Sequence, residues 1–268
     1  MEDNTMLLHF LFGTVSIAAT ALVYIGNPTL SWWWICLLLP AAYIAVFAIS
    51  LLILWGISLL LPRKDTSVCR TACRNTILCW LRWLLPIMGI KTNATGLDIL
   101  PQEPFLLVCN HVSNFDPMVT LLALKNTHLA FVSKPENFRI PAVGPFLRNA
   151  AFLSIDRENP RRALTAIHRA AEYIQTDKLC IGIYPEGTRS KNKQLLPFHR
   201  GSFKIAKLAK CPVAVLSIRY ETSGRLFAPR IAHLTVETVL DAAFVAENQT
   251  ATISDCARQH IENRLNKK

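Results

Sequence analysis

Two long stretches near the N-terminus contain no charged side chain. They run from Met6 to Gly26 and from Leu30 to Leu61, and Gly26 to Thr29 between them have the composition of a turn. As helices they would measure about 30 Å and about 48 Å, against a bilayer hydrocarbon core of about 30 Å. The pattern therefore predicts a helical membrane hairpin over residues 1–61.

The second apolar stretch is longer than the hydrocarbon core requires. It must tilt, bend at Pro40 or lie partly in the interface, where Trp32, Trp33 and Trp34 would form an aromatic belt. A secretory signal peptide is excluded because residues 1–5 are acidic rather than basic. Whether the hairpin spans the bilayer or only embeds in it stays open.

Basic residues follow the second apolar stretch. Because positive charge marks the cytoplasmic side of a membrane protein, they predict a cytoplasmic location for the rest of the chain. The expected membrane is the bacterial inner membrane or its equivalent. We interpret residues 62–95 as a basic linker containing an amphipathic interfacial helix near 66–88. The basic residues concerned are Arg63, Lys64, Arg70, Arg74 and Arg82.

From residue 96 onward the hydrophobic pattern changes to short apolar runs that alternate with helical periodicity. This alternation predicts, over residues 96–268, an α/β domain with a mostly parallel sheet flanked by helices. The expected strands lie near 105–109, 129–132, 152–155, 179–183, 213–218 and 232–237, and the expected helices near 117–125, 159–175, 201–210 and 253–266.

Charge is unevenly divided along the chain. Residues 1–61 contain no Lys or Arg, so the remainder carries all 29 basic side chains against 16 acidic ones. Such a surface favours anionic lipid head groups. Nucleic acid is not expected as a partner because the basic residues are scattered and no nucleic-acid motif is present. The eight cysteines lack a CxxC pair, which favours a reducing compartment over a disulfide scaffold or a zinc site.

A histidine and an aspartate follow the first strand of the predicted α/β domain. Asn110-His111 come directly after the apolar run 105–109, and Asp116-Pro117 has the signature of a helix start with Asp116 as N-cap. Asp116 could orient the His111 imidazole so that its other nitrogen takes a proton from a hydroxyl group. Taken alone, the pair favours a structural role.

A second polar turn ends another predicted strand. In Pro185-Glu186-Gly187-Thr188-Arg189, the arginine offers a fork for phosphate and the glycine allows close approach of a ligand to the backbone. The alternative is a loop held by an ion pair between Glu186 and Arg189.

Together, these blocks resemble the glycerolipid acyltransferases, specifically the 1-acyl-sn-glycerol-3-phosphate acyltransferase family. Two further blocks in the right order support the resemblance, which covers about residues 95–220: a segment from Phe131 to Gly144 that runs on to Arg157, and a proline-led apolar strand from Cys211 to Ile218. Asn137 and the Ala150-Ala151 pair depart from the family pattern, in a segment thought to line the acceptor site.

The resemblance implies direct acyl transfer with His111 as general base and Asp116 as its partner. Coenzyme A or acyl carrier protein would carry the acyl thioester as a co-substrate, and neither a cofactor nor a metal would be needed. The acceptor would be 1-acylglycerol 3-phosphate, acylated on its sn-2 hydroxyl to give phosphatidic acid. The residues implied in substrate binding are Glu186, Gly187, Thr188, Arg189, Lys134 and Arg157.

Two alternatives remain at this point. The same chemistry could act on another acceptor, such as a lyso-ornithine lipid, glycerol 3-phosphate or another lysophospholipid. The chain could also be a membrane lipid-binding protein without turnover, although that function would leave His111 and Asp116 unexplained.

Overall fold

The structure of the protein, a computed structural model, describes residues 3–27, 29, 31–63, 69–190, 194–222 and 230–267. Pro28 of the predicted turn, the basic residue Lys64 and residues 66–68 of the predicted interfacial helix lie outside the described residues, as does the side chain of Trp32.

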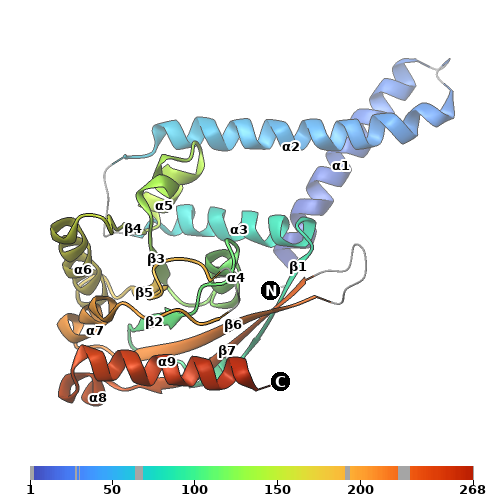
Figure 1. Ribbon diagram of the computed structural model, residues 1–268. Coiled ribbons are helices and arrows are strands. Elements are labelled where there is room, and N and C mark those ends of the chain that lie inside the picture. The colour runs from blue at the N-terminus through green and yellow to red at the C-terminus, as the bar shows by residue number, and fades with distance from the viewer. Residues whose placement is uncertain are drawn as a thin grey trace.

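A seven-stranded sheet forms the centre of the described structure (Figure 1). Its order is β1-β7-β6-β2-β5-β3-β4, and every neighbouring pair is parallel except β6 and β7. This confirms the predicted mostly parallel α/β fold. The strands are β1 (Ile90–Thr95), β2 (Leu106–Cys109), β3 (Leu129–Ser133), β4 (Leu153–Ser154), β5 (Cys180–Ile183), β6 (Val213–Glu221) and β7 (Arg230–Leu240).

Helices cover both faces of this sheet. On one face lie α3, α4 and α5, and on the other lies α9 under β6 and β7, with α6 and α7 toward the β4 end (Figure 1). Because both faces are covered, β2 and β5 are apolar and buried at every position. The helices are α3 (Thr71–Ile87), α4 (Asp116–Ala123), α5 (Val143–Asn149), α6 (Pro160–Gln175), α7 (Lys204–Ala209), α8 (Ala242–Glu247) and α9 (Thr250–Asn266), with 3-10 turns η2 (Leu97–Ile99), η3 (Pro135–Arg139) and η4 (Arg200–Phe203).

The sheet begins earlier in the chain than the sequence pattern indicates. β1 lies within the stretch interpreted as a linker and pairs with β7 along its whole length, so a strand of the sheet precedes the expected domain start at residue 96. Its side chains alternate between exposed positions and buried or partly buried ones, as expected for an edge strand. The division of the chain at 61/62 and 95/96 stays a prediction.

The N-terminal segment folds into two helices that contact each other. They are α1 (Asp3–Gly26) and α2 (Ile35–Leu60), with the short turn η1 (Trp32–Trp34) before α2. Among the described helices, α2 alone is long and apolar enough to cross a bilayer, and the apolar part of α1, Leu11–Gly26, is shorter. Pro40 lies inside α2, which continues beyond it to Leu60.

An aromatic cluster joins the hairpin to the domain. Phe47 of α2 lies 4.5 Å from Trp83 and 5.8 Å from Trp80 of α3, measured between ring centroids. Phe12 of α1 contacts the rings of Trp83 and Tyr43 edge-on, at 6.1 Å and 6.0 Å. Trp83 is only 3% exposed. The cluster fixes α2 alongside α3, so the hairpin runs beside the domain over part of its length (Figure 1).

The packing of β5 against β3 provides a stability test. A Cβ atom added at Gly182 would lie 2.4 Å from Cε1 of Phe131. We expect Gly182→Ala to lower the free energy of unfolding by about 1–3 kcal/mol, because the ring must leave its preferred position. The measurement is thermal and denaturant unfolding of the detergent-solubilised full chain.

Gly201→Ala is the matched control, since no atom lies within 4 Å of its added Cβ. Equal stabilities of the two variants would contradict the close packing of Gly182 against Phe131.

Candidate active site

The predicted site residues all follow the carboxyl ends of neighbouring parallel strands. His111 follows β2, Glu186 to Arg189 follow β5, Lys134 follows β3 and Arg157 follows β4. The carboxyl ends of parallel strands meet at one edge of a sheet, where α/β proteins place their ligands. The topology therefore brings four separate segments of the sequence to the same edge.

Asn110 fixes the turn that carries His111. Its side-chain amide accepts a hydrogen bond from Ile218 N at 2.7 Å and donates one to Ile218 O at 2.9 Å. Asn110 is 1% exposed, so both backbone groups of Ile218 depend on this amide rather than on water. The bond ties the end of β2 to the neighbouring strand β6 and sets the direction in which the chain leaves the sheet.

His111 and Asp116 are in direct contact. Nδ1 of His111 lies 2.8 Å from Oδ2 of Asp116. The same oxygen accepts hydrogen bonds from the backbone N–H groups of Val112 and Ser113, at 2.7 Å and 2.8 Å. The Asp116 side chain is fully buried, while that of His111 is 19% exposed. Because Nδ1 is engaged, Nε2 is the nitrogen available to a ligand.

The predicted N-cap role of Asp116 is wrong. Helix α4 begins at Asp116, Phe115 occupies the N-cap position, and no side chain caps the helix. The carboxylate is turned back to the preceding residues, where it receives the N–H groups of the turn and the imidazole of His111. This orientation frees the carboxylate to hold the imidazole.

Tyr220 completes the hydrogen bonding of Asp116. Its hydroxyl donates to Oδ1 of Asp116 at 2.9 Å, on the opposite side of the carboxylate from His111. Burial raises the pKa of Tyr220, and the nearby Asp116 charge raises it further, so the hydroxyl stays a proton donor at physiological pH. Sequence reasoning missed this residue. The available signal was its place on the strand 213–221, where it shares a face with Ile218.

The ring of Tyr184 packs against the candidate base. It stacks on the His111 imidazole with centroids 4.5 Å apart and continues onto Phe131 at 5.4 Å. Burial raises the pKa of Tyr184 well above its ordinary value, so the ring carries no charge beside the imidazole. One aromatic face and one carboxylate therefore hold the imidazole, and Phe131 packs on Tyr184 in turn. Tyr184 was also missed, because its contact with His111 depends on the pairing of β2 with β5.

Glu186 joins the turn after β5 to the turn after β2. Its Oε1 accepts the N–H of His111 at 2.5 Å, and its Oε2 accepts the N–H of Leu196 at 2.9 Å. Burial raises the pKa of Glu186, while these two N–H groups oppose that shift. Both oxygens are thus engaged by backbone rather than by Arg189. The prediction that Glu186 contacts substrate stays a prediction.

Gly187 lies where three parts of the site meet. Its φ of +72° is a left-handed conformation, and an added Cβ would lie 2.9 Å from the His199 ring and 3.5 Å from the Arg157 guanidinium. The next two residues, Thr188 and Arg189, are exposed, as is Lys134. A cavity of about 220 Å³ opens beside this turn, and Arg157, His199 and Ser202 are among its polar lining residues. The apolar lining includes Val132, Ile155, Ile167, Ile183 and Ile205.

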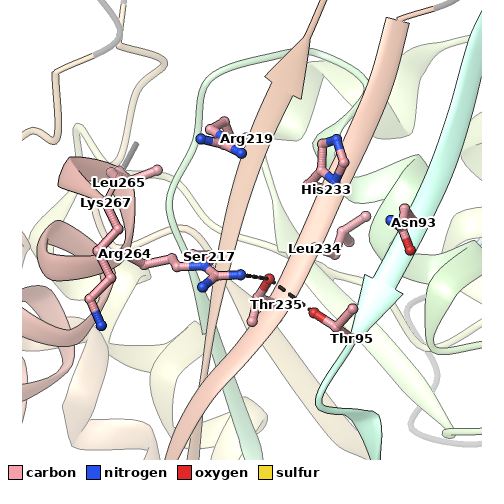
Figure 2. Close-up of a pocket in the computed structure, with 10 residues that line it drawn as sticks. All are labelled: Asn93, Thr95, Ser217, Arg219, His233, Leu234, Thr235, Arg264, Leu265 and Lys267. Atoms are coloured by element: carbon pink, nitrogen blue, oxygen red, sulfur yellow. Dashed lines mark hydrogen bonds between the residues drawn. The ribbon is translucent and has the colours of Figure 1, made fainter.

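A second histidine–carboxylate pair lies on the opposite face of the sheet. His233 Nε2 is 3.1 Å from Glu221 Oε2, but the Glu221 side chain is 63% exposed. His233 of this pair lines a polar cavity of about 350 Å³ between strands β1, β6 and β7 and the end of α9 (Figure 2). There the hydroxyl of Thr235 accepts hydrogen bonds from the guanidinium of Arg264 and the hydroxyl of Thr95. An exposed carboxylate holds an imidazole weakly, so the candidate base is His111.

Cys109 does not suit a nucleophilic role. It is fully buried beside the site, and burial together with the Asp116 charge raises the pKa of its thiol well above the ordinary value. A protonated thiol is a poor nucleophile. Within the described ranges, no three His, Cys, Asp or Glu side chains lie close enough together to hold a metal ion.

Comparison with known proteins identifies relatives of the domain. A chloroplast 1-acyl-sn-glycerol-3-phosphate acyltransferase of Brassica napus is 35% identical over 138 residues, which is 51% of this chain and 39% of that protein. The 1-acyl-sn-glycerol-3-phosphate acyltransferase of Haemophilus influenzae is 31% identical over 139 residues, which is 50% of this chain and 56% of that protein. The chain thus spans about half the length of the curated relatives it matches.

The fold is also found among solved structures. The crystal structure of PlsC, the 1-acyl-sn-glycerophosphate acyltransferase of Thermotoga maritima, superposes with a TM-score of 0.58 at 23% identity, over 72% of this chain and 78% of that one. The model of the Acyltransferase family matches residues 91–219, which include all the predicted site residues and β1 except its first residue. Over these residues, which make up just under half of the chain, it is similar to the Acyltransferase family.

Proposed function

We propose that this chain is a membrane-attached O-acyltransferase. It moves an acyl chain from a coenzyme A or acyl carrier protein thioester to the sn-2 hydroxyl of 1-acylglycerol 3-phosphate and forms phosphatidic acid. The observation that carries the proposal is the His111–Asp116 pair, in which a fully buried carboxylate holds Nδ1 at 2.8 Å, so that Nε2 is the nitrogen available to a ligand, and the His111 side chain is 19% exposed. The names of the relatives support this acceptor and reaction.

The proposed step is a direct transfer. Nε2 of His111 takes the proton from the acceptor's hydroxyl group while the oxygen of that hydroxyl attacks the thioester carbonyl. The carbon–sulfur bond then breaks, the new ester forms, and the proton on His111 neutralises the departing thiolate. Asp116 stabilises the imidazolium between these two proton transfers, as an orienting carboxylate does in other hydroxyl-activating pairs. No covalent acyl-enzyme is required.

The acceptor phosphate is assigned to the exposed cations at the same edge. Arg189 follows the Gly187 turn, Lys134 follows β3, and Arg157 lies beside Gly187. A guanidinium can bind a phosphate with two parallel hydrogen bonds, which favours Arg189 as the principal contact. Thr188 would add a hydroxyl donor next to Arg189.

Membrane attachment follows from the substrate as well as from the hairpin. A lysophospholipid keeps its acyl chain in the bilayer, so its hydroxyl is presented at the interface. Helix α2 carries apolar side chains on its outer surface, and its aromatic contacts with α3 hold the domain beside it. We assign the domain to the cytoplasmic face, because Arg63 and the arginines of α3 follow α2.

The first experiment tests the base. Membranes containing the full chain receive a labelled long-chain acyl-CoA or acyl carrier protein and a panel of acceptors that includes lysophosphatidate, glycerol 3-phosphate and lyso-ornithine lipid. We expect lysophosphatidate to be acylated, and His111→Ala to lower kcat at least about a hundredfold, as removal of a general base does.

His233→Ala is the matched control, because it removes the other carboxylate-paired imidazole and should leave the rate unchanged. Acylation that survives His111→Ala would refute the mechanism. Acylation confined to a phosphate-free acceptor would refute the assigned acceptor. If no acceptor were acylated, the result would favour a lipid-binding protein without turnover.

A second experiment tests Tyr220 as a positioning residue. Tyr220→Phe removes only the hydroxyl that donates to Asp116. A hydrogen bond to a charged group contributes about 1.5–3 kcal/mol, so we expect kcat to fall about tenfold or more. The KM for both substrates should stay unchanged, because Tyr220 touches Asp116 rather than substrate.

Tyr173→Phe serves as the control, since it removes a hydroxyl bonded to Arg169 on α6. If the two variants had the same kcat, Tyr220 would have no role in positioning Asp116.

A third experiment tests the phosphate contact. Arg189→Gln should raise the KM for lysophosphatidate about tenfold or more, since a charge-assisted hydrogen bond to phosphate is lost. Any activity on a phosphate-free acceptor should be unaffected. Arg162→Gln on α6, whose side chain is 75% exposed, is the charge-matched control. If the KM for lysophosphatidate stayed constant in Arg189→Gln, Arg189 would be excluded as a contact of the acceptor phosphate.

A further inference from the structure

A cavity separates the end of α2 from the segment that follows β3. Its volume is about 360 Å³. Trp55, Ser58 and Leu59 from the last turns of α2 form one wall, and Ile140 and Pro141 form part of the other. None of the predicted site residues lines it, and it shares no residue with the cavity beside Gly187. It is therefore a separate feature at the junction between the hairpin and the domain.

Three arginines line this cavity from different parts of the chain. Arg63 follows α2, Arg139 ends η3, and Arg148 lies in α5 with its guanidinium 5.0 Å from the centre of the Phe138 ring. Among the described residues that line the cavity, no side chain is acidic. Three positive charges around a partly apolar space favour an anion that guanidinium groups bind with paired hydrogen bonds, as they bind phosphate.

The cavity has an apolar side and a charged side, arranged as the acyl chains and the head group of a membrane lipid are. Its apolar wall continues onto the outer surface of α2, where Leu52 and Leu60 are 61% and 85% exposed. Its arginines lie where the apolar stretch ends, which in an inserted helix is the depth of the lipid phosphates. Trp55 is suited to the same depth, because it combines an apolar ring with a polar N–H group.

We propose that this cavity binds the phosphate head group of an anionic phospholipid of the bilayer, with its acyl chains along α2. This lipid is neither acceptor nor product; it fixes α2 against the η3–α5 segment. The inference rests on the proposed membrane attachment and is independent of the acyl-transfer chemistry.

The test measures lipid retention without turnover. The full chain is first floated with phosphatidylcholine vesicles, which tests membrane attachment alone. It is then extracted in mild detergent from bilayers of equal phosphatidylglycerol and phosphatidylcholine, and retained lipid is measured by native mass spectrometry. We expect phosphatidylglycerol to be retained in preference, and the double variant Arg63→Gln/Arg139→Gln to lower its retention about tenfold or more.

Two controls separate this site from general attraction and from catalysis. Lys210→Gln/Lys267→Gln removes the same charge from exposed positions near α7 and α9, across the sheet from α2 (Figure 1), and should retain phosphatidylglycerol like the unaltered chain. His111→Ala should also retain it, so loss of acylation and loss of this site are distinguishable.

Several results would overturn the inference. Failure to float would remove its basis, and equal loss in the two double variants would mean that only net charge matters. Displacement of the lipid by millimolar inorganic phosphate would indicate a free-phosphate site. Displacement by lysophosphatidate, but not by phosphate, would mean that the cavity belongs to the acceptor.

Discussion

The buried carboxylate of Asp116 is the constraint on which the site depends. It receives four donors: the imidazole of His111, the N–H groups of Val112 and Ser113, and the hydroxyl of Tyr220. A charge taken fully out of water is tolerated only when hydrogen bonds replace its hydration. The turn after β2 therefore has to adopt the conformation that presents these donors, and that conformation places His111 at the edge of the sheet.

The remaining contacts make this arrangement a property of the whole sheet. Asn110 ties the turn to β6, Glu186 ties it to the segments around β5, and Tyr184 stacks on the imidazole from β5. Each contact comes from a strand next to β2 in the order β6-β2-β5. The geometry of the candidate site is thus supported by strand pairing, and the residues proposed to bind substrate, such as Arg189, lie outside this set and are exposed.

The sequence was sufficient for the features that depend on local pattern. Alternating apolar runs predicted six strands of the sheet, and the order of four motifs predicted which strand ends carry His111 and Arg189. What local pattern could not supply is register. Tyr220 reaches Asp116 only because β6 lies beside β2, a pairing across more than 100 residues. The edge strand β1 was missed because half its side chains are exposed and polar. The carboxylate of Asp116 was assigned to a helix cap, because spacing alone does not show which way a side chain turns.

The aromatic cluster between α2 and α3 has a consequence for how the protein can be divided. Trp83, which is 3% exposed, contacts the rings of Phe12 and Phe47 and donates a hydrogen bond to the hydroxyl of Tyr43, and all three partners belong to the hairpin. Cutting the chain after Leu61 would expose Trp80 and Trp83 to solvent as an apolar patch that is prone to aggregation. The hairpin is therefore part of the packing of the domain rather than a separable anchor. Its removal would alter the domain itself and the distance between the candidate site and the proposed membrane surface.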